Sequence, residues 1–303
     1  MERGRTLSRS MKDKLFSLLL ASPAIIMTTV FILVPVVDSV IKSFTKYQIK
    51  NIISGKPGTW NNFQNYIKLF QNAKLPQAIS NTFIFVIVVV LSAFILGMAL
   101  SLILNSNVKG AKIIQGVMMT PWVIPTVISA LIWMWLFQPQ YGLVKYLISV
   151  FSGGAVSNLA VLNNPKTALM GVSIAALWKQ VPLMTLLLLA GLQNVPEELL
   201  EAATVDGANR VQKFLHITIP SMRSVISIAV SMSIIENFKQ FPLFWTMTGG
   251  GPDGATTTLA ILSYREAFVS QDLGSGAAVT TVWMLLMIGV IFIYNKLFKK
   301  SDD

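Results

Sequence analysis

The sequence predicts an all-α integral membrane protein with six transmembrane helices, and three observations lead to this prediction. Of the 303 residues, 53% are hydrophobic and only 12% are charged, whereas about 25% of the residues of a soluble globular domain are charged. Six apolar runs reach the length of about 20 residues that a helix needs to cross a bilayer. The basic residues behind the net charge of +11 lie mostly between these runs. The charge is therefore interpreted as a signal of membrane topology rather than of nucleic-acid binding.

The six runs are taken as one membrane domain, residues 15–298. The spans are expected at residues 15–37, 82–104, 113–137, 167–192, 225–247 and 277–295. The first run follows a basic tail, residues 1–14, as a signal peptide would. It is longer than the core of a signal peptide, which has about 7 to 15 residues, so a retained span is expected. A short tail, residues 299–303, follows the last span.

The distribution of lysine and arginine predicts the side of the membrane that each loop faces. The short segments on the side of the amino-terminal tail hold thirteen of these residues, and the opposite segments, which are longer in total, hold nine. Basic residues accumulate on the cytoplasmic side of membrane proteins. Both termini and the loop at residues 193–224 are therefore expected in the cytoplasm, and the protein in the cell membrane.

The loop at residues 193–224 contains a polar hairpin with the sequence EAATVDGANRVQKFLHITIP at residues 201–220. Its apolar positions suit two short helices, expected at residues 196–205 and 209–216. The first helix carries acidic residues and no basic residue, namely Glu197, Glu198 and Glu201. Anionic lipid head groups would repel such a helix. Docking onto another protein is therefore favoured over a hairpin that lies on the lipid surface.

The ends of these two helices are also predicted. Asn194 and Glu197 have the spacing of a capping box, and Pro196 between them is expected in the first turn, where a missing N–H costs little. Gly207 is expected to end the first helix in a left-handed conformation. Pro220 is expected to stop the second helix just before the next span.

The same stretch resembles the EAA loop of the permease subunits of binding-protein-dependent ABC importers. The family pattern is Glu-Ala-Ala, three residues, glycine, and then about nine residues to Ile-x-Leu-Pro. The residues that fall on the pattern are Glu201, Ala202, Ala203, Gly207, Ile217 and Pro220, with Ile219 in place of the usual leucine. The resemblance implies that the hairpin is a coupling helix that docks into a cleft on a cytoplasmic ATPase. The coupling residues that it implies are Glu201, Ala202, Ala203, Asp206, Gly207, Phe214 and Pro220.

Four other stretches are similar to carbohydrate-uptake permeases of the maltose and glycerol-phosphate type. They are NFQNYIKLF (residues 62–70), PWVIPTVISALIWMWLF (121–137), ALWKQVPLMTLLLLAGLQNVPEEL (176–199) and TGGGPDGATTTL (248–259). The resemblance implies a heterodimer with a second, non-identical permease subunit and a homodimeric or heterodimeric cytoplasmic ABC ATPase. It also implies an extracytoplasmic solute-binding protein that delivers a sugar or oligosaccharide, and import driven by ATP.

The sequence contains no phosphate-binding loop of its own. SGKPG (residues 54–58) follows its Gly-Lys pair with proline, and GGGPDG (249–254) has no lysine. ATP and Mg are therefore expected on the partner ATPase, and no cofactor is expected in this chain. The single histidine, His216, has no neighbour at metal-ligand spacing, and cysteine is absent. The chain is therefore not expected to be an enzyme.

Three ionisable residues lie within the predicted spans, where charge is costly and usually functional. Lys179 in the fourth span and Glu236 in the fifth have similar predicted depths, so Lys179 is expected to approach Glu236 or to share a water-filled cavity with it. Lys239 can reach Glu236 at the i, i+3 spacing. One interpretation is a charge pair that fixes helix packing. The other is a translocation cavity for a sugar, whose hydroxyls acids and amides bind and whose ring packs on aromatic faces. The residues expected in that substrate pathway are Trp178, Lys179, Glu236, Asn237, Lys239 and Gln240.

Two segments of the outer loops also show a pattern. Phe63, Tyr66, Ile67 and Phe70 have helical spacing. They predict a short helix that rests on the outer membrane leaflet or on the spans, with contact to a binding protein as the alternative. The glycine-rich residues 249–254 are interpreted either as a flexible outer turn or as a backbone surface that helps to seat the binding protein.

Other classes of membrane protein remain as alternatives at this point. A self-sufficient secondary transporter or channel would show inverted repeats or broken helices around a midplane site. Pro121 and Pro125 are able to break the third span, but the pattern shows no matching interruption in the other half. An exporter or a regulatory membrane scaffold would dock the hairpin on something other than an ATPase.

Overall fold

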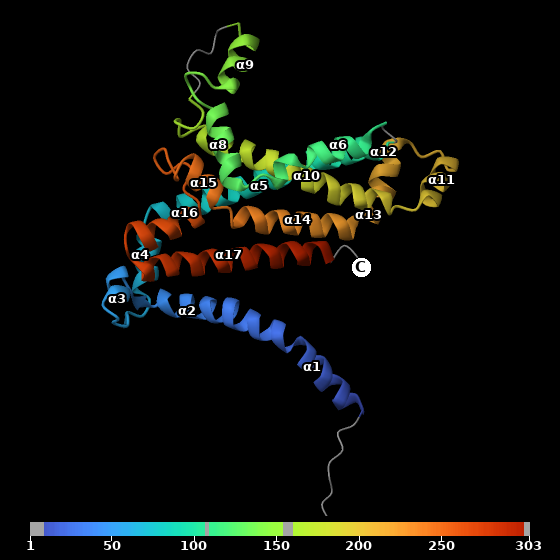
Figure 1. Cartoon of the computed structure of the whole chain (residues 1–303). Coiled ribbons are helices and arrows are strands. Elements are labelled where there is room, and N and C mark those ends of the chain that lie inside the picture. Colours follow the sequence, from blue (N-terminus) through green and yellow to red (C-terminus); the bar gives the residue numbers. More distant parts are fainter. Residues whose placement is uncertain (1–8, 107–108, 154–159, 300–303) are drawn as a thin grey trace, which may run out of the picture.

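The computed structural model describes residues 9–106, 109–153 and 160–299. Figure 1 shows long helices lying side by side, with α1 leading away from the bundle. Of the expected tails, residues 1–8 and 300–303 lie outside the described residues. In the described part, the first helix begins at Arg9 and the last ends at Lys299, so each helix extends into the residues assigned to a tail.

The fold is mostly helical, as expected, but it includes two short strands. The elements of the first half are α1 (Arg9–Thr28), the π-helical η1 (Thr29–Leu33), α2 (Val34–Ser43), β1 (Thr45–Lys46), α3 (Ile49–Ile53), β2 (Thr59–Trp60), α4 (Gln64–Gln71), α5 (Lys74–Asn105), α6 (Ala111–Met118), α7 (Thr120–Val123), α8 (Thr126–Leu136) and α9 (Leu143–Phe151). Those of the second half are α10 (Ala168–Gln193), α11 (Glu197–Val205), α12 (Arg210–Lys213), the π-helical η2 (Phe214–Thr218), α13 (Ile219–Ser221), α14 (Arg223–Phe238), α15 (Pro242–Met247), α16 (Leu259–Tyr264), the π-helical η3 (Arg265–Val269) and α17 (Leu273–Lys299). β1 and β2 pair antiparallel, with Thr45 opposite Trp60.

The described residues contain four helices that are long and apolar enough to cross a membrane without a sharp bend, or up to six spans if each of two bent helix pairs counts as one. The four are Phe16–Ser43, Lys74–Asn105, Ala168–Gln193 and Leu273–Phe298. The bent pairs are Ala111–Val123 with Thr126–Leu136, at 94°, and Arg210–Ser221 with Arg223–Phe238, at 72°. Several helices are longer than the spans predicted from uncharged runs, because a helix continues into residues that flank the apolar core.

The break in the third span follows from its prolines. Ile124 and Pro125 are extended, with ψ of 131° and 139°. Proline has no N–H to give to the preceding turn and disfavours a helical conformation for the residue before it. The predicted span at residues 113–137 is therefore two helical segments, and Figure 1 shows α8 standing across the direction of α6.

The predicted fifth span, residues 225–247, is wrong as one continuous helix. α14 ends at Phe238, and α15 begins only at Pro242. Proline sits in the first turn of α15, where helices accept it because its missing N–H would have no partner there. Lys239 is therefore the C-cap of α14 and not part of a continuous helix.

The core lies along the contact between α5 and α10. Buried residues of α5, such as Val89 and Ala93, face buried residues of α10, such as Ala176 and Leu188. Close approach of the two helices requires a glycine, because a Cβ at Gly97 would lie 2.7 Å from Cγ of Met184. Close packing around small residues is a main source of helix association in membranes.

The glycine-rich residues 249–254 are hydrogen-bonded to neighbouring elements, so the interpretation as a simple flexible turn is wrong. Thr257 Oγ1 donates to the carbonyl of Gly250 at 2.9 Å, and Arg265 Nη2 donates to the carbonyl of Gly249 at 2.6 Å. Asn81 of α5 donates to the carbonyl of Gly254 at 3.0 Å. These bonds tie the loop to α5 and η3.

The packing at Gly97 leads to a testable prediction. Gly97→Val is expected to destabilise the protein by about 1 to 3 kcal/mol, because it over-packs the contact with Met184. The matched control is Gly289→Val, where nothing lies within 4 Å of an added Cβ. Thermal unfolding in detergent, followed by tryptophan fluorescence, should show a lower midpoint for Gly97→Val only. Equal midpoints for the two variants would contradict the proposed packing.

Candidate functional sites: a cavity between the spans and a polar hairpin

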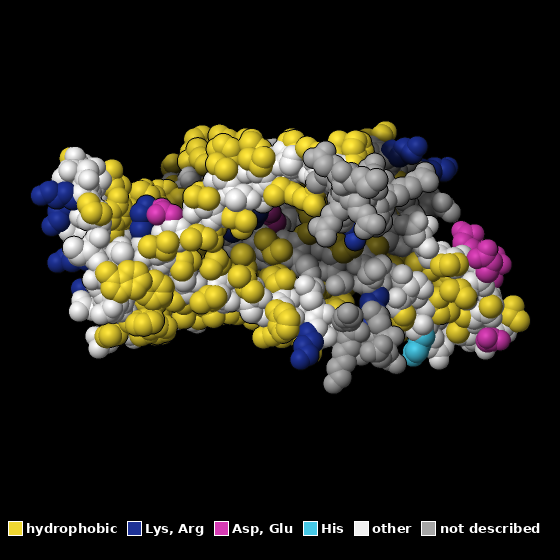
Figure 2. Space-filling model, turned by 90° about the horizontal axis from the view of Figure 1, so that it is seen from below, with side chains coloured by type: hydrophobic (Ala, Val, Ile, Leu, Met, Phe, Trp, Pro, Cys, Tyr) yellow, Lys and Arg dark blue, Asp and Glu magenta, His cyan; other side chains and the backbone are white. Residues whose placement is uncertain are grey.

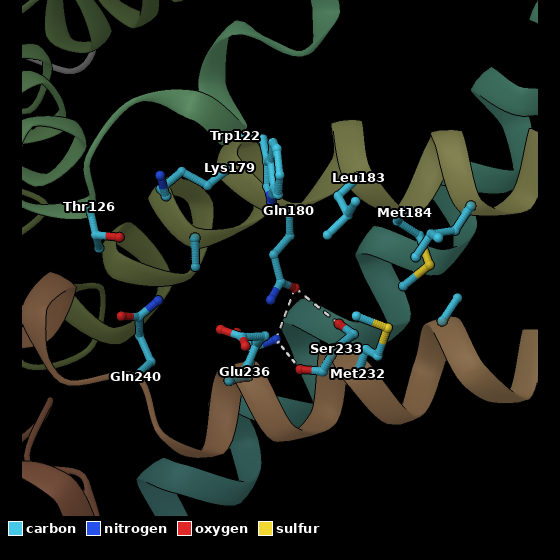
Figure 3. Close-up of a pocket in the computed structure, with 14 residues that line it drawn as sticks. Trp122, Thr126, Lys179, Gln180, Leu183, Met184, Met232, Ser233, Glu236 and Gln240 are labelled. Carbon is cyan, nitrogen blue, oxygen red and sulfur yellow. Dashed lines mark hydrogen bonds between the residues drawn. The ribbon is translucent and has the colours of Figure 1, made fainter. Parts of the chain in front are cut away.

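A cavity of about 370 Å³ opens between the two halves of the chain. Figure 3 shows its wall, formed by α10, α14, the α7–α8 turn and the start of α8. One part of the wall is apolar, with Leu183, Met184, Leu187 and Met232. The other part is polar, with Lys179, Gln180, Ser233, Glu236, Asn237 and Gln240. The mixed wall suits a ligand that has both polar and apolar faces.

Gln180 of α10 is the centre of a hydrogen-bond network with α14. Its Oε1 accepts from Ser233 Oγ at 3.0 Å and from Asn237 Nδ2 at 2.9 Å. Asn237 Nδ2 also donates to the carbonyl of Ser233 at 2.8 Å. Asn237 is 2% exposed, and its Oδ1 has no partner among the described residues. Gln180 and Ser233 are residues that the sequence reasoning missed, although Gln180 directly follows Lys179.

Lys179 hydrogen-bonds to the backbone at the break in the third span and does not pair with Glu236. Its Nζ donates to the carbonyl of Pro121 at 3.3 Å and also to the carbonyl of Ile124. Figure 3 shows the side chain pointing toward the α7–α8 turn near Thr126. Lys179 and Glu236 do line the same cavity. The two side chains therefore share a cavity, as one alternative of the prediction stated, but they do not contact each other as the other alternative stated. The reason is that the extended backbone before α8 leaves carbonyls that need a donor.

Glu236 pairs with Lys239, as the i, i+3 spacing predicts. The distance from Lys239 Nζ to Glu236 Oε1 is 2.8 Å, and both side chains are more than half exposed. Glu236, Asn237 and Gln240 line the cavity, but Lys239 is not part of its wall. The structure thus places Lys239 outside the wall of this cavity, in an ion pair with the wall residue Glu236.

The aromatic residue of the cavity is Trp122 and not the predicted Trp178. Trp178 packs edge-on against Trp133, with ring centroids 6.0 Å apart, and lies outside the cavity wall. Trp122 lies in α7, between Pro121 and the break at Pro125. The two prolines were the signal that places this ring at a turn beside the cavity.

The polar hairpin forms at the carboxyl-terminal end of α10. Gly207 has φ of 81°, the expected left-handed conformation, and nothing lies within 4 Å of an added Cβ. Its second helix begins with a capping box in which Asn209 accepts from the Gln212 N–H at 2.9 Å. The sequence reasoning missed this box.

The predicted capping box of the first helix is wrong. Pro196 is itself the N-cap of α11, with ψ of 126°, and no side chain caps this end. Asn194 instead ends α10 and donates back to the carbonyl of Ala190 at 2.8 Å. The connection between α10 and α11 is too short for Asn194 to cap both the end of α10 and the start of α11.

Pro220 does not stop the second helix, contrary to the prediction. The helix runs through η2 and α13 to Ser221, and the break comes at Met222. Proline here occupies the first turn of α13, where it is tolerated. The resulting 72° bend lies between the hairpin and the predicted fifth span. The interruption that the sequence did not predict lies inside that span, between α14 and α15.

The coupling residues implied by the resemblance lie mostly on the surface of the hairpin. Glu201, Ala202, Asp206, Gly207 and Pro220 are exposed, and Ala203 and Phe214 are half-buried. Phe214 packs against the core between α5, α10 and α14. Figure 2 shows acidic side chains gathered at the hairpin end of the molecule. The hairpin thus presents an acidic, low-relief surface and has one aromatic side chain anchored in the core.

Comparison with known proteins identifies the family. Residues 93–301 match the family described as "Binding-protein-dependent transport system inner membrane component". The chain belongs to this family. It is a multi-pass membrane component of a transport system and not an enzyme.

Curated relatives cover nearly the whole chain. The chain is 31% identical over all 303 residues, 100% of both proteins, to the trehalose/maltose transport system permease protein MalF of Thermococcus litoralis. It is 31% identical to the sulfoquinovosyl glycerol transport system permease protein SmoG of Agrobacterium fabrum, over 96% of this chain and 92% of that protein. It is 32% identical to the sn-glycerol-3-phosphate transport system permease protein UgpA of Yersinia pestis, over 91% of each.

A solved structure shares the fold. The crystal structure of a bacterial ABC transporter involved in the import of the acidic polysaccharide alginate contains a chain that matches with a TM-score of 0.80 and 20% identity, over 96% of this chain and 98% of that chain. A second structure of the alginate transporter, in complex with an alginate pentasaccharide-bound periplasmic protein, matches with the same TM-score. At this identity the likeness concerns the fold alone.

The role of Lys179 at the broken span leads to a second prediction. Lys179→Met is expected to destabilise the protein by about 1 to 3 kcal/mol, because it leaves the carbonyls of Pro121 and Ile124 without their donor. Lys239→Met, which removes a half-exposed ion pair, is the control and should cost less than about 1 kcal/mol. Unfolding midpoints in detergent compare the two. A larger loss for Lys239→Met would exclude this role of Lys179.

Proposed function

We propose that the chain is one of two non-identical permease subunits of an ATP-driven importer that takes up a sugar or oligosaccharide. The observation that carries the proposal is the full-length likeness to a relative named for trehalose and maltose transport. The other two relatives are named for the transport of sulfoquinovosyl glycerol and glycerol phosphate, which are also small solutes with several hydroxyl groups. An extracytoplasmic binding protein delivers the solute in this proposal, which the family description supports.

The proposed topology has six spans in the cell membrane, with both termini and residues 193–224 in the cytoplasm. The bent pair Ala111–Val123 with Thr126–Leu136 then counts as one span, whereas in the second bent pair only α14 belongs to a span and Arg210–Ser221 belongs to the cytoplasmic hairpin. The excess of lysine and arginine on that side supports this orientation. In Figure 1 the carboxyl-terminal end of α17 lies at the same end of the bundle as α11 and α12.

The hairpin is the proposed contact to a homodimeric or heterodimeric cytoplasmic ABC ATPase. α11 would enter a cleft of the ATPase with Glu201, Ala202 and Ala203, and Asp206 and Gly207 would shape the turn. Phe214 would transmit the motion, because it links the hairpin to the core between the spans, and Pro220 would do so at the start of the fifth span. ATP binding would then close the ATPase and move the spans as rigid bodies between inward-facing and outward-facing states.

The nucleotide is proposed to bind outside this chain. ATP and Mg would be held by the partner ATPase, since the sequence has no phosphate-binding loop. Among the described residues, no group of three or more His, Cys, Asp or Glu side chains is placed to hold a metal ion. No cofactor is proposed for this chain.

The cavity is the proposed translocation pathway. Glu236 and Gln240 would hydrogen-bond sugar hydroxyls, together with the amide nitrogen of Gln180, whose oxygen is already occupied. Asn237, which lines the pathway but is buried, would hold Gln180 in place. Trp122 would offer the aromatic face on which a pyranose ring packs. Lys179 would take part indirectly, by holding the α7–α8 turn that carries Trp122.

The coupling role of the hairpin is testable by reconstitution. The chain is assembled in nanodiscs with its partner permease and ATPase, and stimulation of ATP hydrolysis by a sugar-loaded binding protein is measured. Gly207→Pro and Glu201→Arg are expected to abolish most of the stimulation, because proline cannot adopt φ of 81° and arginine reverses the charge of the docking surface.

The matched control for the hairpin is Gly55→Pro. Gly55 also has positive φ, 64°, and open space around its Cα, but it lies at the opposite end of the bundle. Stimulation should stay close to that of the wild type in this variant. Normal coupling in Gly207→Pro and Glu201→Arg would place the ATPase contact elsewhere in the chain.

The cavity leads to a separate prediction. Trp122→Ala is expected to raise the KM of sugar transport about 2- to 10-fold, the loss of one aromatic contact of about 0.5 to 1.5 kcal/mol. Trp135→Ala is the control, because Trp135 is 73% exposed and lies outside the cavity wall. Uptake of labelled sugar into proteoliposomes gives the KM of each variant. An unchanged KM for Trp122→Ala would remove this ring from the pathway.

A further inference from the structure

The segment between the first two spans forms a small folded unit with an apolar outer face. α4 is fixed to the end of α2, because Asn65 Nδ2 donates to the carbonyls of Ser43 and Thr45 at 2.9 Å each. The hydroxyl groups of Ser43 and Tyr66 lie 2.6 Å apart. The unit is also tied to the start of α17, where the Gly274 N–H donates to the carbonyl of Tyr47 at 2.9 Å.

Three of the four residues of the predicted stripe face away from the protein, whereas Tyr66 packs inward against the core. Asn65 and Leu69 are the buried residues of this helix. Phe63, Ile67 and Phe70 are 63%, 54% and 65% exposed. The exposed large hydrophobic residues of the unit, which we call the end-face patch, are Ile52, Ile53, Trp60, Phe63, Ile67 and Phe70. Soluble surfaces rarely expose apolar patches of this kind without a covering partner.

The end-face patch continues the apolar surface of the first span. Phe44, the residue directly after α2, stacks on Trp60 at 5.6 Å and packs edge-on against Phe63 at 5.2 Å. Ile41 in the last turn of α2 is also exposed, at 52%. The aromatic rings therefore begin where a membrane-spanning helix ends, which is the depth at which aromatic belts meet lipid head groups.

The charge within the segment that carries the end-face patch is of one sign. Residues 44–81 contain five lysines and no acidic residue. All five are exposed, namely Lys46, Lys50, Lys56, Lys68 and Lys74. Figure 2 shows basic side chains gathered beside apolar ones at the end of the molecule where α3 and α4 lie, opposite the acidic hairpin. A ring of lysines around an apolar face is the pattern that binds anionic membrane surfaces.

We propose that the end-face patch inserts into the head-group region of the adjacent membrane leaflet and that its lysines bind anionic phospholipid. The unit is then a lipid anchor that holds the outer ends of α2 and α17 at a defined depth. A soluble acidic binding protein would also complement the lysines. It fits less well as occupant of the apolar patch, because the patch would be left in water whenever the protein dissociates. The proposal does not rest on the transported solute.

Site-directed spin labelling tests this anchor. The chain has no cysteine, so Ile67→Cys and Phe70→Cys each give a single labelling site in the complex with its partner permease and ATPase. Gln64→Cys and Gln71→Cys, at the exposed polar first and last residues of α4, are the matched controls. The rate at which the spin label collides with oxygen, which concentrates in lipid, is compared with its rate of collision with a water-soluble nickel chelate. Both rates are measured in nanodiscs without binding protein.

The expected result is a several-fold higher ratio of oxygen to nickel collision at positions 67 and 70 than at positions 64 and 71. The ratio should rise further when phosphatidylglycerol is added to phosphatidylcholine, and Lys56→Gln with Lys68→Gln should remove this rise. High nickel collision at positions 67 and 70 would overturn the proposal, and protection only on adding the binding protein would assign the patch to that protein. Exclusion of both reagents would assign it to the partner permease and equally overturn the lipid anchor.

Discussion

A bilayer core offers no water to a free backbone carbonyl, so every carbonyl released by a broken span must find a donor inside the protein. The third span is broken at Pro125, and Lys179 from α10 donates to the carbonyls on its near side. The position of α8, the turn with Trp122 and the open cavity beside it all depend on that contact. A charged residue in a span is thus explained first by backbone chemistry, before any ligand is considered.

The cavity and the hairpin belong to the same two helices. α10 and α14 line the cavity with Gln180, Ser233 and Glu236, and the hairpin is the connection between these helices. Gln180 bonds to Ser233 and Asn237 across the interface, so a displacement of one helix changes the polar wall of the cavity. In the proposed importer, this arrangement brings the step that uses ATP and the step that moves sugar onto one structural element.

The two ends of the bundle have opposite chemistry. The hairpin end carries the acidic residues of α11, and the opposite end carries a lysine-ringed apolar patch on α3 and α4. Acidic residues on a low-relief helix suit contact with a protein, whereas lysines around exposed aromatic rings suit contact with a lipid surface. In the proposed importer, the chain would therefore offer one end to an energy-supplying partner and the other to the membrane itself.

The sequence by itself determined the class of the protein, the helix content, the approximate places of the spans and the hairpin with its left-handed Gly207. These follow from composition, from the length of apolar runs and from local turn chemistry, which act over a few neighbouring residues. It did not determine where the fifth span ends, which tryptophan lines the cavity or what Lys179 bonds. Only the tertiary structure decided those points, because the partner of Lys179 lies 55 residues away along the chain and the neighbours of Trp178 and Trp122 depend on how far the third span bends.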